Sequence, residues 1–281
     1  MARIKITCDT ACDLPRDLSR RYRIDLLPLG VRLGSEHRHD RLDVNSRELY
    51  AYTEKTGRLP GISPISPRDF RDSFQAYLSQ GYQIVHISLS SQLSLCYRNA
   101  CIAAEDLDGV YVVDSQSIST GAGQLAMLGA ELASADYEAK EIAQALNDMK
   151  KHMDVSFVLQ SPRYLHRKGK RGGFSDYLTR LFHLRPEIEV SQGAVHLGKP
   201  FRGNMEDTIL SYVKTRLSGR HNIQTDRIFI TYSGVPQTIV DKAAELLQQI
   251  QPFDQVLTVP ASSAVSCRCG PGSLGLAFMT I

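Results

Sequence analysis

The sequence predicts an α/β protein whose N-terminal domain is a parallel sheet with helices on both faces. A smaller domain of mixed α/β structure is predicted to follow. The alternation of sequence patterns supports this fold class. Short apolar runs alternate with amphipathic stretches of roughly ten or more residues along the first half of the chain. Strands joined by helices of that length pair in parallel and place helices on both faces of the sheet.

The N-terminal elements follow from this alternation. The short apolar runs predict strands at Ile4–Cys8, Leu26–Leu33, Ile84–Leu89 and Val110–Asp114. The amphipathic stretches predict helices that begin near Pro15 and span Ser46–Thr56, Pro67–Gln80, Ser94–Asp106, Gly123–Ala135 and Glu138–Met153. We place the end of this N-terminal domain near Val155, so that it covers residues 1–155.

Residues 156–281 show a less regular pattern and are predicted to form the smaller, mixed domain. Apolar runs indicate strands at Ser156–Gln160, Glu187–Val190, Ala194–Leu197, Arg227–Tyr232 and Ser273–Thr280. Helices are expected over Met205–Leu217 and Gln237–Ile250. The dipeptide Gln192-Gly193 between two short strands is a hairpin signal, which predicts antiparallel pairing.

Composition excludes several classes of protein. With 42% hydrophobic and 22% charged residues, the chain of 281 residues is neither disordered nor a typical membrane protein. No apolar run is long enough for stable membrane insertion. The net charge of +3 is too small to indicate a nucleic-acid partner. The first residues run directly into a strand pattern without a secretory signal, so we expect a cytoplasmic protein.

The basic residues are not spread evenly along the chain, and one run stands out. It consists of Arg163, His166, Arg167, Lys168, Lys170 and Arg171. Only Tyr164 could serve as a base-stacking platform, which argues against single-stranded nucleic acid. The run is either a solvated loop, a phosphate contact or a docking surface for an acidic partner.

Six cysteines form three close pairs, but none has the Cys-x-x-Cys spacing of a zinc site. We therefore expect no metal. The arginine within Cys267-Arg268-Cys269 could lower a thiol pKa and raise its reactivity. The glycine-rich segment that starts at Gly270 is too near the C-terminus for a dinucleotide-binding unit, so no cofactor is expected.

The loop Ser90-Ser91-Gln92-Leu93-Ser94 follows an apolar strand and precedes a helical pattern. Its hydroxyls would cluster at a helix N-terminus, where unpaired N–H groups and a partial positive charge favour an anion. The simpler alternative is that Ser94 only caps the helix. In an open parallel sheet this loop should meet Asp9-Thr10 and Asp114-Ser115 at the carboxyl ends of the strands.

Four blocks of the sequence resemble motifs of the DegV family of bacterial fatty-acid-binding proteins. Residues 7–15 resemble T-D-S-T-A-D-L-P, and residues 89–97 resemble S-S-G-L-S-G-T-Y. Residues 114–123 resemble D-S-K-S-x-S-x-G-x-G, and residues 270–278 resemble G-P-G-A-L-G-x-A-F. The resemblance implies a non-enzymatic carrier that holds one long-chain fatty acid between two domains. It also implies a partner, an acyl-phosphorylating kinase that resembles dihydroxyacetone kinases, to which the carboxylate is presented.

Carried over residue by residue, the resemblance places the carboxylate-binding serine at Ser94 and a head-group arginine at Arg202. Residues 168–173 follow the family's K-G-G-R-I only loosely, and three site positions depart from the family pattern. Ile62 replaces a threonine, Leu95 replaces a glycine, and Arg268 stands where a head-group histidine is expected. The permanent charge of Arg268 could offset the hydroxyl lost at Ile62. The supporting hydroxyls are expected from Ser63, Ser90 and Ser91.

Three alternatives remain open. The chain could be a divergent carrier of another amphipathic carboxylate. It could instead be a phosphotransferase or hydrolase acting on a small anionic substrate in the same cleft, which would need a base near Ser94. His86 is the sequence-near candidate for that base. Finally, it could be a regulatory module that docks through the run from Arg163 to Arg171 and holds lipid only as a structural component.

Overall fold

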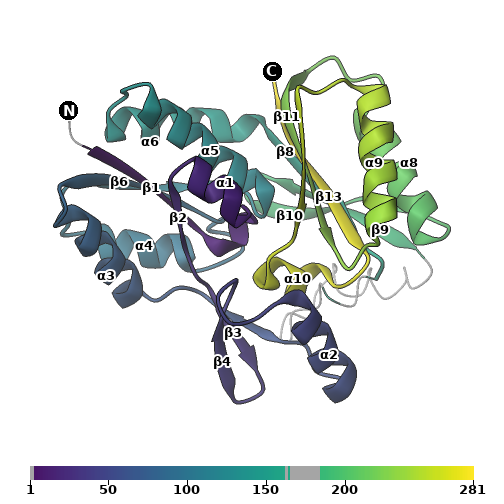
Figure 1. Cartoon of the computed structure of the whole chain (residues 1–281), viewed down its shortest axis with the longest axis horizontal. Helices are drawn as coiled ribbons and strands as arrows, with labels where there is room; N and C mark the ends of the chain where they lie inside the picture. The colour runs from purple at the N-terminus through teal and green to yellow at the C-terminus, as the bar shows by residue number, and fades with distance from the viewer. Residues whose placement is uncertain (1–2, 162–163, 165–183) are drawn as a thin grey trace.

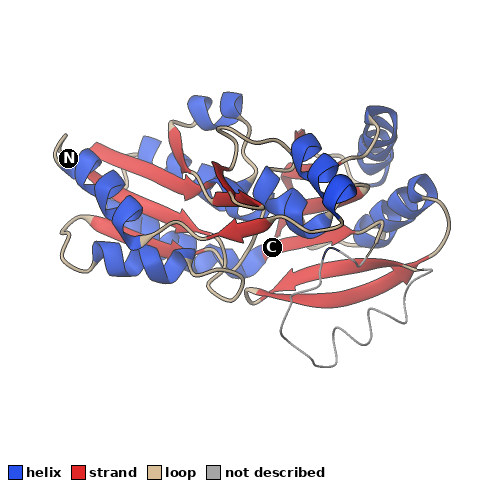
Figure 2. Ribbon diagram, turned by 90° about the horizontal axis from the view of Figure 1, so that it is seen from below, coloured by secondary structure: helices blue, strands red, loops and turns tan. Residues whose placement is uncertain are grey.

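A computed structural model describes residues 3–161, 164 and 184–281 of the chain. The basic residues of the run from 163 to 171 lie outside the described residues, so the role of this run stays a prediction. In the described part, the chain forms a four-stranded, a six-stranded and a three-stranded sheet. The two larger sheets lie side by side along the length of the molecule (Figures 1 and 2).

The four-stranded sheet confirms the predicted parallel architecture. In sheet order its strands are β2 (Ile24–Leu27), β1 (Arg3–Asp9), β6 (Tyr82–Ser88) and β7 (Val110–Asp114), and every neighbouring pair is parallel. The helices of one face are α3 (Pro67–Leu78) and α4 (Cys96–Ala104), and those of the other are α5 (Thr120–Ser134) and α6 (Ala139–Met149) (Figure 1). The short α1 (Arg16–Arg21) packs beside β2.

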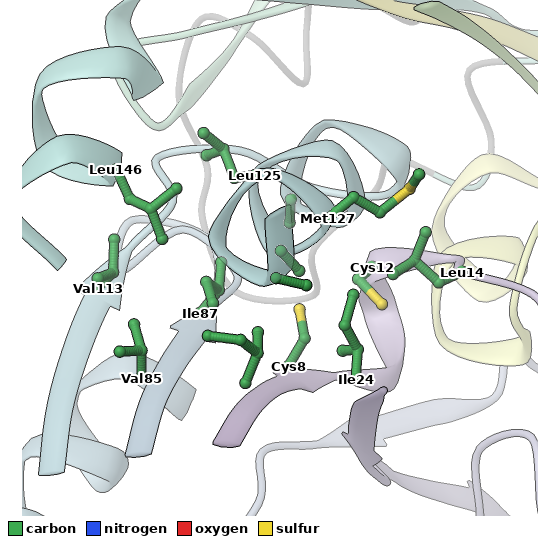
Figure 3. Close-up of a cluster of buried hydrophobic side chains, with 14 of the residues drawn as sticks. Cys8, Cys12, Leu14, Ile24, Val85, Ile87, Val113, Leu125, Met127 and Leu146 are labelled. Atoms are coloured by element: carbon green, nitrogen blue, oxygen red, sulfur yellow. The ribbon is translucent and has the colours of Figure 1, made fainter. Parts of the chain in front are cut away.

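Successive side chains of β6 point to opposite faces of the four-stranded sheet. Val85 and Ile87 pack with Leu125 and Met127 of α5 in the cluster drawn in Figure 3. His86, between them in sequence, points to the opposite face, because side chains alternate along a strand. Both faces of this sheet are therefore buried, as parallel sheets require.

The second sheet is mixed. Its order is β10 (Ala194–Phe201), β9 (Arg185–Ser191), β8 (Met153–Val158), β13 (Ser273–Thr280), β11 (Ile223–Ser233) and β12 (Gln255–Pro260). Only β11 and β12 pair in parallel among these described strands. The helices α8 (Met205–Leu217) and α9 (Gln237–Ile250) cover one face (Figure 1). The predicted hairpin at Gln192-Gly193 is confirmed, with positive φ at both residues. The predicted domain boundary after residue 155 falls inside β8 and stays a prediction.

The three-stranded sheet corrects one predicted strand. The expected strand Leu26–Leu33 is wrong as a single element, because Pro28 divides it into β2 and β3 (Gly30–Leu33). Proline lacks the N–H group that a continuing strand would need. The strand β3 pairs with β4 (Glu36–His39) and β5 (Gly61–Ser63), and this small sheet lies with α2 (Ser46–Thr56) below the two large sheets in Figure 1.

Several element boundaries also differ from those expected. The predicted helix Glu138–Met153 is too long: α6 ends at Met149, a 3₁₀ turn covers Lys150–His152, and Met153 already pairs with Met279 in the sheet. The sequence patterns also missed β12 and the short helix α10 (Ser263–Cys269), which contacts α2. Another 3₁₀ turn, η1 (Thr10–Cys12), follows β1. No helix in the described ranges is long and apolar enough to cross a membrane.

Packing of α5 against η1 gives a test of this fold. A Cβ at Gly123 would lie 2.6 Å from the backbone oxygen of Cys12, which cannot move away easily. We expect Gly123→Ala to lower the free energy of unfolding by about 1–3 kcal/mol, because overpacking outweighs the gain in helix propensity. Urea unfolding measures the change.

The matched control is Gly129→Ala on the same helix, where the added Cβ meets side-chain methyl groups, the nearest being Leu146 Cδ1 at 3.2 Å. Its change in unfolding free energy should stay within about 1 kcal/mol. Equal losses for the two variants would contradict the close packing of α5 on η1.

Candidate functional site

A cavity of about 360 Å³ lies between the four-stranded and six-stranded sheets, within the size range of small-molecule sites. The N-terminal side contributes residues that follow the carboxyl ends of β1, β6 and β7, where parallel sheets bind ligands. The opposite wall is formed by β8, β13, β11 and α10. Apolar lining residues include Leu29, Leu89, Ile118, Phe157, Val195 and Val265. The interior therefore suits a hydrocarbon.

The cavity owes its space partly to small residues on β13. Ser273 and Gly275 line the cavity, and they alternate along this strand with leucines that also pack toward α8 and α9. A Cβ at Gly275 would lie 2.8 Å from the backbone oxygen of Ser156 on β8. Larger side chains in these positions would fill the space between the sheets.

Ser94 lines the cavity at the start of α4. Its Oγ accepts a hydrogen bond of 3.2 Å from the Cys96 N–H. The hydroxyl thus caps the first turn of the helix, which the simpler interpretation of Ser94 had predicted. Since the helix begins at Cys96 rather than Ser94, the serine lies just outside it, beside its positive end.

Three other predicted site residues line the same cavity. Arg268 projects from the last turn of α10, is exposed, and forms no ion pair with the described residues. Ile62 lines the cavity from β5, at the position where the family motif has a threonine hydroxyl. Leu95 is 56% exposed although it lines the cavity, which indicates that it lies where the cavity opens to solvent.

The remaining predicted residues do not line the cavity. Ser63 lies on β5 opposite Gly30, and Ser91 is exposed. Arg202 is exposed in the connection between β10 and α8. Ser90 is buried, and its Oγ donates to the Gly193 carbonyl at 2.6 Å.

The hydrogen bond from Ser90 to Gly193 shows that the serine loop also holds the β9–β10 hairpin in place. The Gln92 side chain also donates to the Gln192 carbonyl at 2.6 Å. The loop therefore binds the turn of the β9–β10 hairpin and joins the two larger sheets. The predicted convergence of strand ends is confirmed as well, because Asp114 accepts the Ser91 N–H and Asp9 accepts the Leu89 N–H.

Two buried carboxylates fix α10 beside the cavity. The Asp13 carboxylate accepts the Ser262 N–H at 2.7 Å and the Ser119 hydroxyl at 2.6 Å. The Asp40 carboxylate accepts the Ala264 N–H at 3.2 Å. Both side chains are fully buried. Negative groups at a helix N-terminus are stabilising, so these aspartates position the helix that carries Arg268.

Burial also changes the protonation of these groups. It raises the pKa of Asp13 to about 6, although the nearby Arg41 guanidinium and the hydrogen bonds from Ser119 and Ser262 lower the pKa. Burial raises the pKa of Asp40 in the same direction. The hydrogen bonds that the two carboxylates accept from the start of α10 are therefore opposed by the cost of removing the carboxylates from water.

The thiols near the site are not reactive groups. Burial raises the pKa of Cys267 to about 12, although Arg268 lowers it. The expected activation by the adjacent arginine is therefore wrong, because desolvation of the thiolate exceeds the attraction of an exposed guanidinium. Burial also raises the pKa of Cys269 to about 12. Among the described residues, no cluster of His, Cys, Asp or Glu could hold a metal ion.

His86 does not serve Ser94 as a base. Its Nδ1 lies 3.0 Å from the Thr7 Oγ1, and its Nε2 lies 3.5 Å from an Asp9 oxygen. The ring is fully buried against Phe70 and Phe74 and does not line the cavity. The enzymatic alternative thus lacks the base that it required.

Sequence reasoning missed a group of hydroxyl residues in the cavity wall. They are Ser119, Thr120, Thr231, Ser233 and Ser273. Thr120 Oγ1 and Thr231 Oγ1 form a hydrogen bond of 2.8 Å between α5 and β11. The polar residues after β7 gave a signal for Ser119 and Thr120. Those on β11 become recognisable only from the strand register.

Asp13 gives a pH test. Because its pKa in the folded state is raised to about 6, its stabilising contribution is fully present below the unfolded pKa of about 4 and is lost as pH rises through 6. Relative to Asp13→Asn, the wild type should lose about 1–3 kcal/mol of unfolding free energy between those values. Urea unfolding across this range measures the difference. The matched control is Asp17→Asn on the exposed surface of α1. If the difference in unfolding free energy between the wild type and Asp13→Asn did not change with pH, the raised pKa of Asp13 would be contradicted.

Comparison with known proteins agrees with this fold. The family model described as "Uncharacterised protein, DegV family" matches residues 3–280. A DegV domain-containing protein of Clostridium acetobutylicum is 29% identical over 206 residues, or 73% of this chain and 74% of that protein. The structure of a fatty-acid-binding DegV family protein from Thermus thermophilus has a TM-score of 0.87 at 26% identity, over 99% of this chain and 100% of that one. The Streptococcus pneumoniae fatty acid kinase B3 protein, loaded with linoleic acid, has the same fold, with a TM-score of 0.84 at 17% identity over 100% of both chains. The chain belongs to the DegV family.

Proposed function

We propose that this protein binds one long-chain fatty acid in the cavity between its two large sheets and presents the carboxylate to an acyl-phosphorylating kinase. The observation that carries the proposal is an apolar cavity whose lining also includes Ser94 and Arg268. The fatty acid bound by the Thermus thermophilus relative supports the same class of ligand.

The hydrocarbon supplies most of the binding free energy. Burial of roughly fifteen methylenes at about 0.8 kcal/mol each gives a gross term near 12 kcal/mol. Association and ordering of the ligand reduce this value considerably. The apolar wall is therefore sufficient for affinity, and the polar groups have the separate task of fixing the orientation of the acid.

The carboxylate needs donors because its transfer from water is costly. In this proposal the Ser94 hydroxyl and first-turn N–H groups of α4 donate to it, and Arg268 supplies a positive charge. The hydroxyl that Ile62 lacks is then replaced by the guanidinium. A contribution from Arg202, as the family resemblance implies, would need Arg202 to approach the cavity when ligand binds. Ser63, Ser90 and Ser91 would act indirectly, by supporting the loops around the head group.

Delivery to a kinase is supported by the exposure of Arg268 and Leu95, which both line the cavity. A head group beside them would remain accessible to a second protein while the tail stays buried. The Streptococcus pneumoniae relative, a fatty acid kinase component, supports this kind of partner. A cytoplasmic location belongs to the same proposal, because a kinase needs ATP and all six cysteines are free thiols.

The first test is direct recovery of the ligand. Solvent extraction of purified protein followed by mass spectrometry should release about one equivalent of a long-chain fatty acid per chain. Ser94→Ala should retain less acid, because one carboxylate donor is lost. The control is Ser218→Ala, at an exposed serine after α8 that does not line the cavity. Absence of any stoichiometric acyl compound would overturn the proposal, and full retention by Ser94→Ala would remove Ser94 from the head-group site.

The second test concerns the charge at the head group. Arg268→Gln should weaken binding of a fluorescent fatty acid by about tenfold, because a charge-assisted hydrogen bond contributes roughly 1.5–3 kcal/mol. Arg98→Gln, an exposed arginine of α4 outside the cavity lining, is the control and should bind normally. Arg202→Gln tests the second arginine, and its head-group role requires a loss similar to that of Arg268→Gln. Unchanged affinity in Arg268→Gln would exclude the guanidinium from carboxylate binding.

A further inference from the structure

A buried pair of hydroxyl groups forms part of the cavity wall. Thr120, at the start of α5, and Thr231, on β11, are 2% and 8% exposed and both line the cavity. Their Oγ1 atoms lie 2.8 Å apart. This pair therefore joins the two large sheets inside an otherwise largely apolar space.

The pair has one hydrogen-bond donor to spare. Two hydroxyl groups carry two protons, and the bond between them uses one. Within the described residues, no other hydrogen-bond partner contacts either hydroxyl. A buried donor without an acceptor is costly, and a plain hydrocarbon chain offers no acceptor.

The strand register places the threonine pair at the face of β11 that borders the cavity. Thr231 and Phe229 lie on the face of β11 that packs toward α5, whereas Ile228 and Ile230 pack toward α9. The neighbour of Thr231 on β13 is Gly275, which has no side chain. The next residue in this row is Phe157 on β8, which also lines the cavity. A ligand chain passing over Gly275 would therefore lie beside the threonine pair.

If the pair only filled space, two valines would pack equally well, because valine has nearly the same shape as threonine and has no hydroxyl proton that needs an acceptor. The hydroxyls also differ in position from the head-group donors, since Ser94 lies at α4 and the pair at α5 and β11. Other hydroxyls of the wall have partners outside the pair: Ser119 donates to Asp13, Ser233 bonds to Ser266, and Ser273 donates to the Cys269 carbonyl.

We propose that the threonine pair recognises a hydroxyl group on the acyl chain, so that this carrier prefers hydroxylated long-chain acids over plain ones. The inference rests on the proposed function. A ligand hydroxyl can accept the spare proton and donate to the other threonine oxygen, which satisfies both sides of the contact.

Competition binding with a fluorescent fatty acid tests the preference. The competitors are octadecanoic acid and a series of hydroxyoctadecanoic acids with the hydroxyl at successive positions. At least one isomer should bind the wild type about fivefold more tightly than octadecanoic acid, as expected for one buried hydrogen bond. The double variant Thr120→Val and Thr231→Val should lose this preference and still bind octadecanoic acid.

Two further variants separate recognition from folding. Thr231→Ser keeps a hydroxyl and should keep the preference. Thr208→Val changes a fully buried threonine on α8 that does not line the cavity, and it should behave as the wild type. The inference is overturned if no isomer exceeds octadecanoic acid in the wild type, or if the preference survives in the double valine variant. Failure of every acid to bind would instead overturn the proposed function, and this inference with it.

Discussion

The site depends on two buried carboxylates that hold the N-terminal end of α10. Asp13 and Asp40 come from the first forty residues, and they accept N–H groups of Ser262 and Ala264. This contact joins segments more than two hundred residues apart. The helix is only seven residues long, so its position depends on these tertiary contacts rather than on its own stability. Since α10 carries Arg268 and part of the cavity wall, the same carboxylates determine where the Arg268 guanidinium lies.

A second set of contacts closes the space from the other side. Ser90 and Gln92 bind the turn of the β9–β10 hairpin through its backbone carbonyls. Hydroxyl and amide groups of the serine loop thus hold the sheets together, and Ser94 remains at the cavity. The division of tasks within one short loop explains why several serines occur together although only one of them faces the proposed ligand.

The parallel sheet was predictable because its signal is local. Each strand and each helix could be assigned from the hydrophobic pattern of its own residues. The helix α10 was not, since its small and polar residues show no amphipathic period and are ordered by Asp13 and Asp40. The break at Pro28 was visible in the sequence, but the assignment of β3 to another sheet depends on its distant partner β5. In the site, Ser94 and Arg268 followed from motif resemblance. Thr231 could not be recognised, because the direction of its side chain follows from the pairing of β11 with β13.

The volume of the cavity has an energetic consequence for the unliganded chain. At about 24 cal/mol per Å³, a dry void of about 360 Å³ would cost roughly 9 kcal/mol. That is comparable to the whole net stability of a typical domain. The empty protein must therefore admit water along its hydroxyl-bearing wall or contract, and any ligand that fills the cavity would remove this cost and stabilise the folded chain.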